Sequence, residues 1–151
     1  MRIGATLNIG TILLALLGAC GTADAEEPFR PITDSAKVQW ADMGPQFPNT
    51  QMAVLEGDPS KPANFVFRFR CPDNYKILPH THPGPETITV LEGAFHTGVG
   101  STYDPAALAP VKRGGFFVIP AGTPHFCLCK GDTIIEVHAT GPWEVKMLGA
   151  Q

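Results

Sequence analysis

The sequence predicts an all-β fold, a barrel or sandwich formed by one domain. Short segments rich in β-branched and aromatic residues alternate with turns, and the chain contains 15 prolines and 16 glycines. No long amphipathic helix is apparent in the periodicity of the apolar residues. The length of 151 residues suffices for one buried core and is too short for two.

Residues 1–25 are expected to be a signal peptide. Arg2 supplies a positive charge, residues 9–17 form an apolar run too short to span a bilayer, and Ala23-Asp24-Ala25 matches a cleavage site. A second route is also open, because Leu17-Gly18-Ala19-Cys20 resembles a bacterial lipoprotein box.

Both routes predict a single mature domain, residues 26–151 in the first case, that is periplasmic or secreted. The domain would be anchored to a membrane only if Cys20 is lipidated. The net charge is −3, and no basic patch is visible, so a nucleic-acid partner is not expected.

The first half of the domain is expected to begin with an extended arm, residues 26–34. Strands are predicted at Val38–Trp40 and Gln51–Leu55, separated by a loop rich in Gly and Pro. The clearest strand is Asn64–Cys71, where Phe65, Phe67, Phe69 and Cys71 alternate with polar or aliphatic residues. This aromatic row fits a hydrophobic core or the wall of a ligand pocket, and the core is favoured for most of the rings. The strand Tyr75–His82 follows a turn.

The second half is expected to contain a hairpin, Glu86–Leu91 and Phe95–Val99, around Glu92-Gly93. The connection Gly100–Lys112 can form one helical turn with Asp104 as its cap and Pro105 in first position, either as a surface loop or as a cover for a pocket. The remaining strands are predicted at Phe116–Ile119, Phe126–Cys129, Asp132–His138 and Trp143–Met147.

Two short segments predict a site for one divalent metal ion. In His80-Thr81-His82-Pro83-Gly84-Pro85-Glu86, the two histidines share one face of a strand, and the prolines bend the chain so that Glu86 can approach the same ion. His125 completes the set from Pro120-Ala121-Gly122-Thr123-Pro124-His125. Imidazole nitrogen and carboxylate oxygen suit borderline metals. The predicted ligands are therefore His80, His82, Glu86 and His125.

The same segments resemble the two sequence motifs of the cupins. His80-x-His82-x3-Glu86-x6-Gly93 is similar to the first motif, and Gly114-x5-Pro120-x-Gly122-x2-His125 is similar to the second. This resemblance implies a double-stranded β-helix, or jelly-roll barrel, and a homodimer formed through outer strands. One position departs from the pattern, because many cupins carry Asn where this chain has Cys129.

A metal with four protein ligands keeps positions for water or substrate, as catalytic metals do. Together with the resemblance, this favours a small-molecule metalloenzyme, dioxygenase-type before lyase or isomerase. A non-catalytic module that binds a small ligand or the metal itself is the alternative, and a structural metal that closes the barrel is a third. The ion would be Zn, Mn, Fe, Ni or Cu, with Cu and Zn favoured by affinity if loading follows export.

The strand Thr133–His138 offers two further polar residues, Glu136 and His138. If the polar side of this strand faces the pocket, either residue can carry a proton to the site. If Ile135 and Val137 face inward instead, which is the usual arrangement for this pattern, Glu136 and His138 lie on the surface.

Besides Cys20, the chain contains Cys71, Cys127 and Cys129. The last two share a strand face with His125. Buried free thiols are the favoured interpretation, a disulfide from Cys71 to one of the other two comes second, and a thiolate ligand for the metal comes third.

Overall fold

The computed structural model describes residues 31–32 and 34–149. The predicted signal peptide, the lipoprotein box and the expected start of the domain at residue 26 lie outside the described residues. In the part of the chain that is described, no helix is long and apolar enough to cross a membrane. The elements are η1 (Ser35–Lys37), β1 (Ala41–Asp42), β2 (Gln51–Glu56), β3 (Asn64–Cys71), β4 (Lys76–Thr81), β5 (Glu86–Val99), η2 (Pro105–Ala107), β6 (Ala109–Lys112), β7 (Phe116–Ile119), β8 (His125–Thr140) and β9 (Lys146–Met147).

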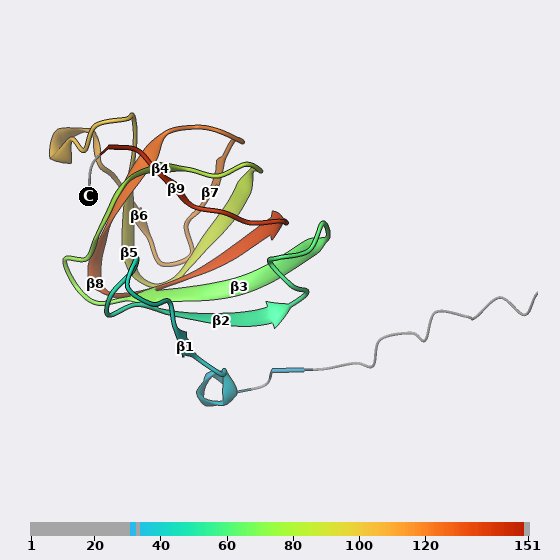
Figure 1. Cartoon of the computed structure of the whole chain (residues 1–151). Helices are drawn as coiled ribbons and strands as arrows, with labels where there is room; N and C mark the ends of the chain where they lie inside the picture. Colours follow the sequence, from blue (N-terminus) through green and yellow to red (C-terminus); the bar gives the residue numbers. More distant parts are fainter. Residues whose placement is uncertain (1–30, 33, 150–151) are drawn as a thin grey trace, which may run out of the picture. The chain divides into compact units, whose positions relative to one another are not determined.

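Within the described residues, the strands form one nine-stranded antiparallel sheet that curls around a shared interior (Figure 1). Strand β8 is its centre, since it pairs with β5 along most of its length, with β3 through its C-terminal half and with β4 through its N-terminal end. The other edge of β5 pairs with β7 and then with β6. The predicted all-β jelly-roll fold is confirmed.

The aromatic row of β3 faces the interior, as its alternation predicts. Phe65, Phe67 and Phe69 are 1%, 2% and 5% exposed, and they belong to the main core cluster. Phe67 and Phe69 also line an internal cavity, so the row serves both as core and as pocket wall.

The prediction of a hairpin around Glu92-Gly93 is wrong. Strand β5 continues through this point for 14 residues, and its pairing with β8 shifts register between Val90 and Glu92 and again between Glu92 and Ala94. Gly93 has φ +67°, and a Cβ there would lie 2.6 Å from Thr133 Oγ1. Glycine therefore permits a bulge in a continuous strand, where the sequence suggested a turn.

Strand β8 also continues through a glycine at which the sequence suggested a break. The separate strands expected at Phe126–Cys129 and Asp132–His138 are one strand of 16 residues, with Gly131 at φ +71° inside it. The expected strand at Trp143–Met147 is reduced to Lys146–Met147, which is β9.

The strand expected at Val38–Trp40 is also wrong, because the first pairing occurs at Ala41–Asp42. Val38 is buried, and Trp40 lies under the guanidinium of Arg70, 4.6 Å from ring centroid to Cζ. The helical turn expected after Asp104 is confirmed as η2, where Asp104 Oδ1 accepts a hydrogen bond from Ala106 N at 2.9 Å.

Candidate metal centre

Three of the four predicted ligands converge at one end of the barrel. His80 and His125 are cross-strand partners on β4 and β8, and His82 follows directly after β4. Their exposed fractions are 4%, 2% and 5%, in that order. Ligand nitrogens of the three rings all lie within 4.8 Å of one another. The three buried imidazoles can therefore hold one metal ion.

Backbone carbonyls fix the tautomer of each ring. The Nδ1 atoms of His80, His82 and His125 lie 2.7, 2.8 and 2.9 Å from the carbonyl oxygens of Leu78, Glu144 and Thr123, respectively. A carbonyl oxygen only accepts, so each Nδ1 carries the hydrogen, and each Nε2 keeps its lone pair. This is the arrangement of histidines that bind a metal through Nε2.

Burial keeps these imidazoles neutral. It lowers the pKa of His80 from 6.5 to about 3, and the neighbouring His125 acts in the same direction. Burial also lowers the pKa values of His82 and His125, against the opposing effect of their hydrogen bonds to backbone carbonyls. At neutral pH a metal ion would not have to displace a proton from any of the three rings.

Glu86 adjoins the histidine group through His82. It is the first residue of β5 and 4% exposed, and its Oε2 lies 3.3 Å from Nε2 of His82. Its Oε1 accepts a hydrogen bond from Trp143 Nε1 at 2.5 Å. Burial raises the pKa of Glu86, while the Trp143 hydrogen bond acts in the opposite direction.

The pairing of His82 with Glu86 tests whether a metal fits. With Nδ1 of His82 protonated, Nε2 presents a lone pair to a carboxylate oxygen, so two acceptors face each other. A proton or a cation between them is required to make this contact favourable. A divalent ion shared with His80 and His125 meets that requirement, and the donor set is one that such ions use.

Trp143 and Glu144 contribute to the site and were not identified from the sequence. The Trp143 ring stacks on His82, with centroids 5.3 Å apart and planes 14° apart, and meets Phe67 edge-on. The signal available in the sequence is a tryptophan that follows a Gly-Pro step in an otherwise β-rich domain. Such a tryptophan is a candidate site residue because a buried indole N–H needs a hydrogen-bond acceptor.

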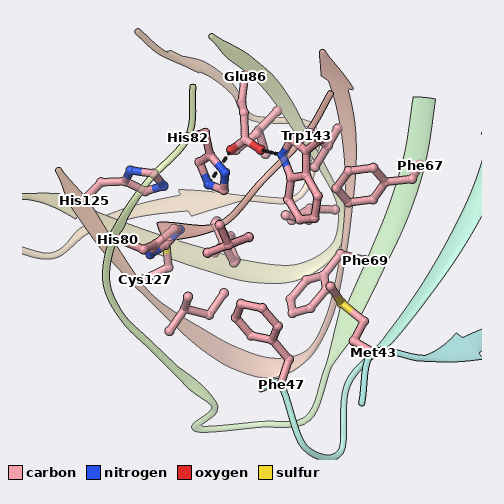
Figure 2. A pocket seen from close by; sticks show the side chains of 16 residues that line it. Met43, Phe47, Phe67, Phe69, His80, His82, Glu86, His125, Cys127 and Trp143 are labelled. Carbon is pink, nitrogen blue, oxygen red and sulfur yellow. Dashed lines mark hydrogen bonds and ion pairs between the residues drawn. The ribbon is translucent and has the colours of Figure 1, made fainter. Parts of the chain in front are cut away.

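The ligand group lies at one end of an apolar cavity of about 60 Å³. Figure 2 shows the three histidines and Glu86 at this end, with Phe47, Phe69 and Met43 on the opposite wall. Apart from the histidines, Glu86 and Cys127, the lining side chains are aliphatic, aromatic or methionine. Met43, Trp143 and Val145 are the partly exposed members of the lining.

The cysteines differ from one another. Cys127 lines the cavity as a buried free thiol, and burial raises its pKa to about 12. It is absent from the group of converging metal-binding atoms. The expectation of free thiols is wrong for Cys71 and Cys129, which form a disulfide because neighbouring strands β3 and β8 bring their Cα atoms to 6.6 Å. Cys129 therefore has no thiol available at the position where cupins often carry Asn.

Glu136 and His138 lie away from the cavity. Ile135 and Val137 face inward at 4% and 3% exposure, and the two polar side chains point to the outer face of β8. There Glu136 accepts a hydrogen bond from Arg68 Nε at 3.0 Å, and its other oxygen lies 3.1 Å from His138 Nε2. The apolar residues of this strand face inward and the polar ones lie on the surface, as the usual arrangement of such a strand predicts.

Comparison with known proteins matches the central part of the chain to a protein family. A family model described as Cupin domain matches residues 68–141. Germin-like protein subfamily 2 member 1 of Arabidopsis thaliana is 37% identical over 62 residues, which are 40% of this chain and 28% of that protein. The match thus spans only a minor part of the relative's length.

Solved structures share the fold. The polyketide cyclase RemF from Streptomyces resistomycificus has a TM-score of 0.66 and 20% identity, covering 82% of this chain and 88% of that one. A salicylate 1,2-dioxygenase from Pseudaminobacter salicylatoxidans has a TM-score of 0.55 and 16% identity, covering 68% and 31%. Structures of salicylate 1,2-dioxygenase with gentisate are similar as well.

Proposed function

Because this chain belongs to the cupin superfamily, we propose that it is a small-molecule metalloenzyme that holds one divalent ion through His80, His82, Glu86 and His125. Dioxygenase-type chemistry is favoured over lyase or isomerase chemistry. The observation that carries the proposal is the convergence of three neutral imidazoles beside a buried carboxylate. When bound, the ion would supply Lewis acidity and, if it is a redox metal, an electron.

The cavity defines the class of ligand. No lysine or arginine is among the described residues that line it, so a charged group of the ligand could be matched only by the ion. The apolar walls exclude water and would bind a hydrocarbon part. A volume of about 60 Å³ has room for roughly five water-sized groups. These features support a small ligand with an apolar body and an oxygen donor for the ion. The solved neighbours that share the fold include a salicylate 1,2-dioxygenase, which supports the dioxygenase-type chemistry.

The metal assignment is tested by measuring metal content in single-residue variants. His82→Ala and His125→Ala are expected to lower occupancy sharply, because each removes one of the converging nitrogens. His96→Ala is the matched control, since His96 lies on β5 and outside the cavity lining. Equal metal stoichiometry in all three variants would contradict the assignment. Oxygen uptake with catechols, thiols and keto acids then tests the dioxygenase-type activity.

A non-catalytic binding module is the second candidate, and one observation favours it. Apart from the four proposed ligands, the only titratable side chain described in the cavity lining is Cys127, whose pKa of about 12 keeps it a neutral thiol. No general base is therefore provided beyond the ligands themselves. Tight binding of small chelating ligands without turnover, across the same panel, would support the binding module.

Export and dimerisation are part of the proposal. The Cys71–Cys129 disulfide supports a periplasmic or secreted location, because such bonds persist in oxidising compartments. Phe116 and Val118 of β7 are 60% and 52% exposed, and among the described strands β7 pairs only with β5, which supports a homodimer through this edge. Cell fractionation and light scattering of the purified protein test the two statements.

A further inference from the structure

We propose that Trp143 is a positioning residue that restricts Glu86 to one metal-binding oxygen and thereby keeps a coordination position of the ion open. This inference rests on the proposed function, because it requires an ion at the three histidines. It concerns a residue outside both cupin motifs, on the segment between β8 and β9.

The two oxygens of Glu86 have different partners. Oε1 accepts the hydrogen bond from the Trp143 indole at 2.5 Å, whereas Oε2 lies 3.3 Å from Nε2 of His82. Figure 2 shows the carboxylate between the two rings, with one oxygen directed to each. The oxygen next to the histidine group is therefore the one that can reach an ion, and the other is already engaged.

Trp143 is itself held by contacts from separate parts of the fold. Its ring stacks on His82 and meets Phe67 of β3 edge-on, with centroids 5.1 Å apart and planes 65° apart. Its backbone N–H donates to the carbonyl of Pro59 at 2.7 Å. The indole N–H cannot follow a rotating carboxylate without breaking these contacts, so it favours a single orientation of Glu86.

The whole segment 141–148 is tied to the ligand strand. Glu144 provides the carbonyl that accepts from His82 Nδ1, and β9 pairs with β4 so that Met147 lies opposite His80. Leu148 N donates to the carbonyl of Pro79 at 2.8 Å. The segment thus contacts two proposed ligands directly and the strand of a third, which is the arrangement expected of an element that orients a metal site.

The consequence concerns the number of open positions. A carboxylate beside a divalent ion can bind through one oxygen or through both, and hydrogen bonding to one oxygen favours the first mode. Without the indole donor, Oε1 would be free to join Oε2 on the ion. An external ligand would then compete with a protein oxygen for that position.

Trp143→Phe tests the inference, because it retains an aromatic ring on His82 and removes the donor. Trp40→Phe is the matched control, since Trp40 is the only other tryptophan in the chain and lies on Arg70. Each protein is loaded with Co²⁺, its cobalt affinity is measured by chelator competition, and azide is titrated into the visible absorption spectrum.

The expected result is that Trp143→Phe binds azide at least tenfold more weakly than the wild type and Trp40→Phe, while its cobalt affinity does not fall. In the Glu86→Gln background, where the side chain offers a single oxygen, Trp143→Phe should no longer change azide affinity. Unchanged azide affinity in the single variant overturns the proposal. A tenfold loss of cobalt affinity also overturns it, because Trp143 would then only stabilise the ligand set.

A second measurement keeps the test valid if Trp143→Phe does not fold. In zinc-loaded wild-type protein labelled with ¹⁵N-tryptophan, the two indole N–H signals can be followed by NMR. Glu86→Gln should shift the Trp143 signal and leave the Trp40 signal in place, and no shift of the Trp143 signal would overturn the proposal. Failure of the wild type to take up cobalt or zinc at all would instead refute the proposed function, and the inference with it.

Discussion

The chemistry of individual residues at this site depends on burial. Each of His80, His82 and His125 is at most 5% exposed, so the charged imidazolium is disfavoured and the lone pair on Nε2 is available at neutral pH. The same burial makes the metal-free site sensitive to acid, because an unfolded chain would take up the protons that the folded site excludes.

We therefore predict that the free energy of unfolding of the metal-free protein falls as the pH is lowered below about 6.5. The pKa of His80 is lowered to about 3 in the folded state, and those of His82 and His125 are also lowered. Between these values and 6.5 the unfolded chain binds more protons than the folded one, so stability is present above pH 6.5 and is lost toward acid. Urea unfolding between pH 7 and 4.5 measures this slope.

The control for this prediction is His80→Gln, which removes one titrating group from the same position. Its slope should be smaller by about 1 kcal/mol per pH unit. Glu86 acts in the opposite direction, because its raised pKa gives stability at low pH that is lost as the pH rises. This is the effect of a single group, whereas three histidines contribute to the predicted slope. Equal slopes for the wild type and His80→Gln would contradict the prediction.

The converging histidines were predictable at the residue scale, and Trp143 was not. His80 and His82 are two residues apart on a strand, so local geometry places them on one face. His125 lies in the second segment that resembles a cupin motif, and the pairing of β4 with β8 brings it beside His80. Trp143 is 57 residues from Glu86, and their contact depends on the path of the segment after β8. Nothing in the local sequence of either residue specifies that path.

At the scale of elements, the disulfide joins the two strands that carry most of the core. Cys71 ends β3, and Cys129 lies within β8, 58 residues later in the chain. Closing a loop of this length in the unfolded chain stabilises the folded state by roughly 4 kcal/mol in the chain-entropy model.

The double variant Cys71→Ala/Cys129→Ala is expected to lose roughly 2–4 kcal/mol of unfolding free energy in denaturant titrations. Its metal content should be unchanged, because neither sulfur belongs to the group of converging ligand atoms. Cys127→Ala is the control, since it alters a buried thiol without removing a cross-link. A loss no greater than that of the control would show that the disulfide contributes little.

The misassigned turns also belong to this scale. Gly93 and Gly131 have positive φ, as turn glycines do, but both lie inside long strands. The outcome at each glycine is decided by the partner strand, because β5 and β8 continue past the glycine and keep pairing with each other. A bulge and a turn carry the same local signal, so only the non-local pairing distinguishes them.

At the scale of the whole molecule, the metal centre lies at the edge of an apolar core that extends well beyond it. The core cluster extends from Phe65 and Phe67 on β3 through Val90 and Phe95 on β5 to Ile135 and Val137 on β8. The histidines lie at one end of the barrel and are held there by backbone carbonyls. The fold therefore has its own source of stability, and the ion would add to it.

Removal of the metal is accordingly expected to lower the melting temperature without unfolding the domain. Binding at a hundred times the dissociation constant stabilises a folded protein by about 2.7 kcal/mol, which corresponds to a shift of roughly 10 °C for a domain of this size. Calorimetry with and without chelator measures the shift, and His125→Ala, which should show none, is the control. A barrel supported by its apolar core does not depend on the ion to remain folded. Complete unfolding by chelator at 25 °C would therefore contradict this expectation and indicate that the ion closes the barrel as a structural element.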